Sequence, residues 1–246
     1  MINIKRLLSS LKGEQAESVD GSTAITDSKV IEAFVKDSNN TFLVSFPRTG
    51  SHWLRMIMEL YFLKPSLVRA FYYFDATEYL TLHSHDKDLD IERENVIYLY
   101  RDPVDTVFSQ LNYYNEDVND RSRITYWADQ YGQHLNKWLF QENFTKRKSV
   151  LTYEGMKEDL AEEFQKVVAH FGQKLDKDRL RLVAERITKE EVKKKTKHDP
   201  QVLQLSSCYN DARVLFKQFH SKLIWDALTA DREQLCAVFS RPLAAM

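Results

Sequence analysis

The chain has 246 residues, of which 43% are hydrophobic, and this length and composition suit one large α/β domain better than two small ones. Thirty-five basic and 36 acidic residues leave a formal net charge of −1. This balance excludes a global field that would draw the protein onto nucleic acid or an anionic membrane, so any anion-binding site must be local.

The sequence carries no signal for a membrane span or for secretion. No apolar run approaches the roughly 18 to 20 residues that a span needs, and the first residues lack a long enough apolar stretch for a signal peptide. Polar residues dominate the segment before Val30, so we predict a loosely ordered arm over residues 1–29 and one domain over residues 30–246. The only cysteines, Cys208 and Cys236, lack metal-ligand spacing and form no disulfide framework. We expect structural thiols, no metal site and a cytoplasmic protein.

The first predicted unit is a strand, a tight loop and a helix. Residues 41–46 (TFLVSF) form a short, apolar, β-favouring run that stops at Pro47, and Ser51 begins a helical pattern through Leu63. A loop in this position exposes backbone N–H groups at the positive end of a helix dipole. The loop therefore predicts a phosphate-binding site.

The residues of this loop suit an anion. Gly50 permits close backbone approach, Thr49 and Ser51 offer hydroxyl donors, and Arg48 adds a fixed positive charge. The loop lacks the Gly-Lys pair of the motif GxxxxGK[ST]. The alternative is an ordinary capped turn that carries one exposed arginine.

The second predicted unit repeats this plan. Residues 95–100 (NVIYLY) predict a buried parallel strand, Asp102 can cap the next helix, and Pro103 suits the first helical position. Arg101 leaves the strand and Ser109 lies on the polar side of the helix, so the two could hold a second phosphate. The alternative pairs Arg101 with an aspartate and leaves Ser109 solvated.

Further elements complete the expected architecture. A third strand at residues 149–152 precedes a helix over 156–171 that ends at Gly172, and residues 124–140 also look helical. Residues 179–195 and 211–228 predict charged, largely surface helices. Alternating strands and helices predict a P-loop-like, doubly wound parallel sheet flanked by helices, with chemistry in the loops after Phe46 and Tyr100.

Two segments resemble a known family. FPRTGSHW, residues 46–53, and YRDPVDTVFS, residues 100–109, resemble the 5′-phosphosulfate loop and the 3′-phosphate motif of the cytosolic-type sulfotransferases that use 3′-phosphoadenylyl sulfate (PAPS). LHSHD, residues 82–86, lies where that family carries a Lys-Thr-His with its catalytic histidine. YEGMKEDL, residues 153–160, is similar to a third family segment, and TKEEVKKK, residues 188–195, resembles the stretch that touches adenine.

The resemblance implies in-line transfer of a sulfuryl group from PAPS to an acceptor hydroxyl, with adenosine 3′,5′-bisphosphate (PAP) as product and without a metal. It implies that His85 is the general base and that Arg48 stabilises charge on the bridging oxygen. The nucleotide-binding residues that it implies are Arg48, Thr49, Gly50, Ser51, His52, Trp53, Arg101, Ser109, Tyr153 and Thr188. Trp53 would stack on adenine, with core packing as the alternative.

The chain also departs from the family pattern. Arg48 replaces a lysine and cannot donate its proton at any working pH, so only charge stabilisation should survive. His83 replaces the lysine before the catalytic histidine, and both histidines point to the same side if the segment is extended. A C-terminal Arg-Lys-Gly signature is missing, and Arg213 and Lys217 are candidates to substitute for it.

Two other classes of function stay open. A P-loop kinase or NTPase would share the fold, although neither a Walker lysine nor a magnesium carboxylate occurs at the expected place. A non-catalytic nucleotide-binding protein would keep both loops. The aromatic residues of FYYFDATEY, 71–79, could line an acceptor pocket, form a lid or belong to the core, and neither the class of hydroxyl acceptor nor the oligomeric state follows from the sequence.

Overall fold

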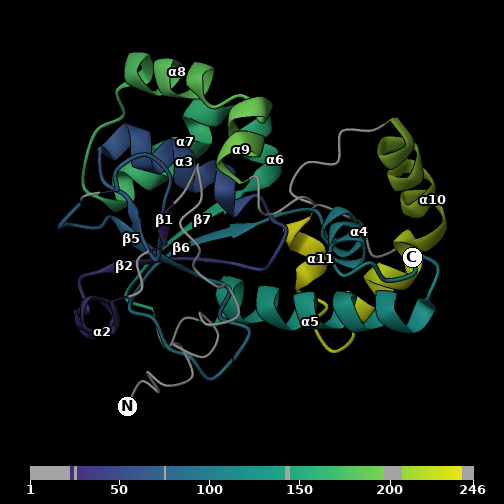
Figure 1. Cartoon of the computed structure of the whole chain (residues 1–246). Helices are drawn as coiled ribbons and strands as arrows, with labels where there is room; N and C mark the ends of the chain where they lie inside the picture. Colours follow the sequence, from purple (N-terminus) through teal and green to yellow (C-terminus); the bar gives the residue numbers. More distant parts are fainter. Residues whose placement is uncertain (1–22, 25–26, 75, 142–144, 197–206, 240–246) are drawn as a thin grey trace.

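The computed structural model describes residues 23–24, 27–74, 76–141, 145–196 and 207–239. At its centre is a five-stranded parallel sheet in the order β3-β5-β2-β6-β7 (Figure 1). The strands are β2 (Thr41–Ser45), β3 (Ser66–Leu67), β5 (Thr81–Ser84), β6 (Asn95–Tyr100) and β7 (Arg147–Thr152). A separate antiparallel pair joins β1 (Thr23–Ala24) to β4 (Arg69–Ala70).

The central strands are buried on both faces, which explains why their sequences are continuously apolar rather than alternating. In β2, Phe42 and Val44 pack into one hydrophobic cluster and Leu43 into the other. In β6, Tyr98 and Ile97 divide in the same way. Because successive side chains of a strand point to opposite faces of the sheet, each strand contributes residues to both hydrophobic clusters.

Helices cover both faces of the sheet (Figure 1). On one side lie α3 (Ser51–Phe62), α6 (Tyr153–Glu158), α7 (Leu160–His170), α8 (Lys177–Arg186) and α9 (Lys189–Lys195). On the other lie α2 (Ser28–Lys36), α4 (Pro103–Tyr113), α5 (Arg121–Phe140), α10 (Ser207–Thr229) and α11 (Leu235–Val238). This arrangement confirms the predicted doubly wound α/β fold, in which the carboxyl ends of neighbouring strands form the binding edge.

Several predicted boundaries are confirmed. The strand at 95–100 matches the prediction, Asp102 caps α4 by accepting the N–H of Asp105 at 3.0 Å, and Pro103 opens that helix. α2 begins at Ser28, slightly before the expected start of the domain, and most of the predicted arm lies outside the described residues. Cys236 is buried, as a structural thiol would be.

Two helical predictions are wrong in detail. The expected helix over 156–171 is two helices, because Asp159 caps a new helix by accepting the N–H groups of Ala161 and Glu162. The expected helix over 179–195 also breaks, at Thr188, which caps α9. α10 is largely exposed over residues 211–228, as predicted, and it also buries apolar side chains against α4 and α5, namely Phe216, Ile224, Trp225 and Leu228.

Within the part of the chain that the structure describes, no helix has both the length and the apolar character needed to cross a bilayer.

Candidate functional site

Three neighbouring strands bring the candidate residues to one edge of the sheet. β5, β2 and β6 lie side by side and run parallel, with Val44 opposite Ser84 and Ser45 opposite Leu99. Their carboxyl ends therefore meet. His85 follows β5, Arg48 follows β2 and Arg101 follows β6. Segments far apart in sequence thus share a single site.

The loop after β2 adopts backbone conformations that shape an anion cradle. Arg48 and Gly50 are both left-handed, with φ of 72° and 94°. A Cβ on residue 50 would lie 2.4 Å from Cδ2 of Tyr153, so only glycine fits there. The buried Thr49 hydroxyl donates to the Phe46 carbonyl at 2.8 Å and serves the turn itself. Ser51, also buried, begins α3 and places the N-terminus of that helix at the site.

The loops after β2 and β6 are joined directly. Arg101 donates from Nη1 to the carbonyl of Arg48 at 3.2 Å, and Arg48 donates from Nε to the hydroxyl of Ser109 at 3.3 Å. The Arg101 guanidinium also lies 4.7 Å from the centre of the Tyr153 ring. The rings of Trp53 and Tyr153 are packed edge to face, with their centres 5.9 Å apart. These five predicted site residues are therefore brought together.

Arg101 has an unused donor. Its Nε is buried and has no hydrogen-bond partner among the described residues, a condition that is rare without a ligand or an ordered water. The alternative ion pair exists only in a weak form, because Nη2 of Arg101 lies 3.9 Å from the Asp105 carboxylate. The structure thus leaves this cation ready to donate to an anion.

The two candidate substitutes on α10 lie beside Arg101. Arg213 donates from Nε to the Asp105 carboxylate at 2.7 Å, and Nζ of Lys217 lies 3.6 Å from Asp102 and 3.9 Å from Asp105. Both cations are thus bound to carboxylates of α4 and its cap, next to the loop that carries Arg101. α10 therefore places these two cations beside Arg101, where carboxylates pair with them.

His83 and His85 do lie on the same side of the chain, as alternation predicts. Their ring centres are 4.7 Å apart, and both contact Ser45. Nδ1 of His85 lies 2.8 Å from the Ser45 carbonyl, and Nε2 of His83 lies 3.1 Å from the Ser45 hydroxyl. A carbonyl only accepts, so the proton of neutral His85 is on Nδ1 and its Nε2 is the basic nitrogen. Burial, followed by the charge of Arg55, holds the pKa of His83 well below its usual range.

His52 is half-buried at the start of α3 and is neutral. Its Nε2 accepts from Nη1 of Arg69 at 2.9 Å, and burial, followed by the charge of Arg69, lowers its pKa well below the usual range. His52 therefore adds no positive charge to the site near neutral pH.

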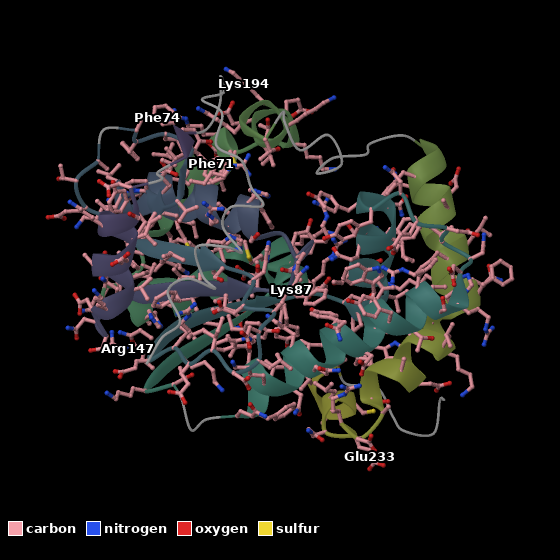
Figure 2. The ribbon with its side chains drawn as sticks, turned by 60° about the horizontal axis from the view of Figure 1, so that its bottom comes forward. Phe71, Phe74, Lys87, Arg147, Lys194 and Glu233 are labelled. Carbon is pink, nitrogen blue, oxygen red and sulfur yellow. The ribbon has the colours of Figure 1, made fainter. Side chains whose placement is uncertain are left out.

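The aromatic segment after β4 is held by α3. Glu59, which is buried, accepts the backbone N–H groups of Phe71, Tyr72 and Tyr73 at 2.9, 2.7 and 2.8 Å. Phe71 is fully buried and belongs to the core, whereas Phe74 is 43% exposed. In Figure 2 both lie on the side of Lys194, toward α9. The segment is thus part core and part surface.

Thr188 lies apart from the contacts above. Its hydroxyl accepts the N–H of Glu191 at 3.2 Å and caps α9. Val192 of the same helix packs into the apolar cluster on which Trp53 rests, so α9 and Trp53 share one face of the sheet.

Sequence reasoning missed the groups that hold the histidine segment in place. Asp86, at φ 35°, forms a buried ion pair with Arg93 at 2.9 Å. His134 of α5 donates to the backbone carbonyl of His85 in this segment, whereas Lys137, three residues further along α5, donates to the carbonyl of Leu89 in the loop that follows. The spacing of two polar residues on a buried helix face was the available signal. Among the described residues, no group of three or more His, Cys, Asp and Glu side chains is arranged to hold a metal ion.

Comparison with known proteins gives one family. A family model described as "Sulfotransferase domain" matches residues 77–207, more than half of the chain. Rat Sulfotransferase 2A2 is 26% identical over 189 residues, which cover 61% of this chain and 65% of that protein. Rat Sulfotransferase 2A1 is 26% identical over 193 residues, 63% of this chain and 66% of that protein. The match thus spans less than two thirds of the length of these relatives.

Two solved structures share the fold. Mouse sulfotransferase SULT7A1 complexed with PAP superposes with a TM-score of 0.52 and 15% identity, over 77% of this chain and 88% of that one. Retinol dehydratase in complex with androsterone and inactive cofactor PAP superposes with a TM-score of 0.51 and 12% identity, over 93% of this chain and 95% of that one. At these identities the likeness establishes the architecture.

Proposed function

Because the chain belongs to the sulfotransferase domain family, we propose that it transfers a sulfuryl group from PAPS to an acceptor hydroxyl and releases PAP. One observation carries the proposal. A histidine, the loop of residues 48–51 and a partly buried arginine lie together at one edge of the sheet, where three adjacent parallel strands end. A base beside a site for phosphate is the arrangement that this transfer requires.

The residues at this edge fit a nucleotide that carries two phosphates. The glycine cradle at Gly50 and the N-terminus of α3 would hold the 5′-phosphate that bears the sulfuryl group. The unused Nε of Arg101 and the hydroxyl of Ser109 would hold the 3′-phosphate. Trp53, edge-on to Tyr153, would offer a ring face to adenine.

The proposed chemistry divides between two side chains. Nε2 of His85 accepts the proton of the acceptor hydroxyl, and the oxygen of that hydroxyl forms a bond to sulfur in line with the bond that breaks. The electron pair of the broken sulfur–oxygen bond stays on the phosphate of the leaving nucleotide. Arg48, held by Ser109, stabilises that charge but donates no proton, because a guanidinium stays protonated at working pH.

The acceptor is proposed only as a hydroxyl compound. The neighbouring retinol dehydratase structure contains androsterone, which makes hydroxysteroids a reasonable first class to test beside phenols, hydroxypeptides and sugars. In the aromatic segment after β4, Phe74 is exposed and Phe71 is buried, so of these two rings only Phe74 offers an apolar contact to a hydroxyl compound.

The test is transfer of labelled sulfate from PAPS to such a panel, with His85→Ala as the matched inactive protein. We expect labelled product with the native protein and a loss of about 10²- to 10⁴-fold with the variant. Tight PAP binding without transfer to any acceptor would instead indicate a non-catalytic nucleotide-binding protein. Phosphate transfer from ATP would indicate a kinase.

A further inference from the structure

His134 lies in the core of the molecule and links strand β6 to the residue that follows β5. It is 1% exposed, its Nδ1 lies 2.9 Å from the Tyr98 hydroxyl, and its Nε2 lies 2.8 Å from the backbone carbonyl of His85. Because a carbonyl only accepts, Nε2 carries the ring proton and Nδ1 accepts from Tyr98. Both ring nitrogens are therefore used, and burial lowers the pKa of His134 to about 3, which keeps the ring neutral.

These bonds form a continuous path from the core to His85. The Tyr98 hydroxyl donates to His134, His134 donates to the His85 carbonyl, and the His85 ring donates from Nδ1 to the Ser45 carbonyl. One of these hydrogen bonds holds the main chain of His85 and another holds its ring. Tyr98 belongs to β6 and Ser45 to β2, the two strands that carry the phosphate loops.

The hydrogen bond from His134 to the His85 carbonyl is separate from the bonds that hold the loop after His85. Lys137, one turn further along α5, donates to the carbonyls of Leu89 and Ile91. α5 therefore contacts the segment after β5 at two places. Of these two contacts, the one made by His134 is with His85 itself. Figure 2 shows Lys87, which lies between these two points in sequence, near the middle of the molecule and well away from Arg147 at the far edge.

We propose that His134 is a positioning residue for the reaction: through the His85 carbonyl it sets the place and orientation of the His85 ring, so that Nε2 faces the acceptor hydroxyl. This inference rests on the proposed function of His85 as general base. Misplacement of a reacting group by about 1 Å costs roughly 10²-fold in rate, so one hydrogen bond can matter to turnover. Binding of the nucleotide, which uses other residues, should not depend on it.

The test compares three variants of the full chain. His134→Leu keeps the bulk but cannot donate, and it should lower kcat by roughly 10- to 100-fold while PAP affinity stays within about twofold. His134→Gln can donate to the same carbonyl and should recover most of kcat. Lys137→Met, which removes an equally buried polar group from the same helix, should lower thermal stability while kcat stays within about twofold. An equal loss of kcat in Lys137→Met and His134→Leu would overturn the inference, because it would mean general destabilisation.

A second readout does not depend on sulfuryl transfer. Nitrogen-15 NMR of the His85 ring reports which nitrogen carries the proton. The native protein should give one tautomer, protonated on Nδ1, and His134→Leu should give a mixture, with His134→Gln close to native. An unchanged single tautomer in His134→Leu, together with unchanged kcat, would overturn the inference. Absence of transfer by the native protein would overturn the proposed function alone, since the NMR comparison would still decide the role of His134.

Discussion

Mild acid should destabilise this protein, and His134 should account for a measurable part of the loss. The side chain is 1% exposed, and burial lowers its pKa from 6.5 to about 3. In the unfolded chain the same imidazole titrates near its reference value of about 6.5. Between these two pKa values the imidazole is protonated in the unfolded state and neutral in the folded state. The contribution of His134 to the free energy of unfolding is therefore fully present above about pH 6.5 and is lost as the pH falls toward 3.

The size of the effect follows from the distance in pH. At pH 5, about 1.5 units below the reference pKa, the unfolded state gains about 2 kcal/mol from protonation, while the folded state gains almost nothing. His134→Gln keeps the hydrogen bond to the His85 carbonyl and has no proton to take up. The free energy of unfolding of the variant should therefore fall by about 2 kcal/mol less than that of the native protein between pH 7.5 and pH 5.

The assay is urea unfolding, followed by tryptophan fluorescence, at both pH values. Other buried histidines, such as His170, whose pKa burial lowers to about 4, contribute equally to both proteins and cancel in the comparison. Gln133→Asn, one residue earlier on α5, titrates nothing and should keep the native pH dependence. Equal losses in the native protein and in His134→Gln would refute the reasoning, because they would mean that the folded state accepts the proton.

Three further predictions concern the proposed site. Arg101→Ala should weaken PAP binding, measured by calorimetry, by roughly 10- to 150-fold and leave AMP binding unchanged. The control Arg147→Ala, at the far edge of the sheet, should change neither affinity. Equal affinity of the native protein for PAP and AMP would contradict this prediction. Arg48→Ala should lower kcat more than it raises the KM for PAPS, and Arg48→Lys should stay active in the transfer assay; a change in KM alone would make it a binding residue. Gly50→Ala should abolish PAP binding in calorimetry, because its Cβ would lie 2.4 Å from the Tyr153 ring at a φ of 94°; near-native affinity would contradict this.

The parts of the fold that the sequence predicts are those coded by short-range signals. The strands 41–45 and 95–100, the loops that follow them and the cap at Asp102 all depend on residues a few positions apart. The breaks at Asp159 and Thr188 were missed, because the apolar spacing runs on through both caps. The spacing of apolar residues shows which face of a helix is buried. Only the capping residue shows that one helix ends and another begins.

The support of the site depends on long-range contacts, and for this reason periodicity could not find it. A histidine on a buried helix face is compatible with ordinary core packing until its partners are known. His134 meets Tyr98, 36 positions away, and His85, 49 positions away. No local pattern contains this information. What the sequence does contain is the alternation that puts His83 beside His85, and the structure confirms that geometry.

The two histidines differ in what each ring contacts, and this difference bears on the proposal that His85 is the base. His85 bonds to a carbonyl, which can only accept, so its proton is fixed on Nδ1 and its Nε2 is the basic nitrogen. His83 bonds through Nε2 to the Ser45 hydroxyl, which can donate or accept, so neither tautomer is imposed on it. Because the carbonyl and the hydroxyl belong to the same residue at the end of β2, one serine gives the two rings different hydrogen bonds, and this difference supports the proposal that His85 is the base.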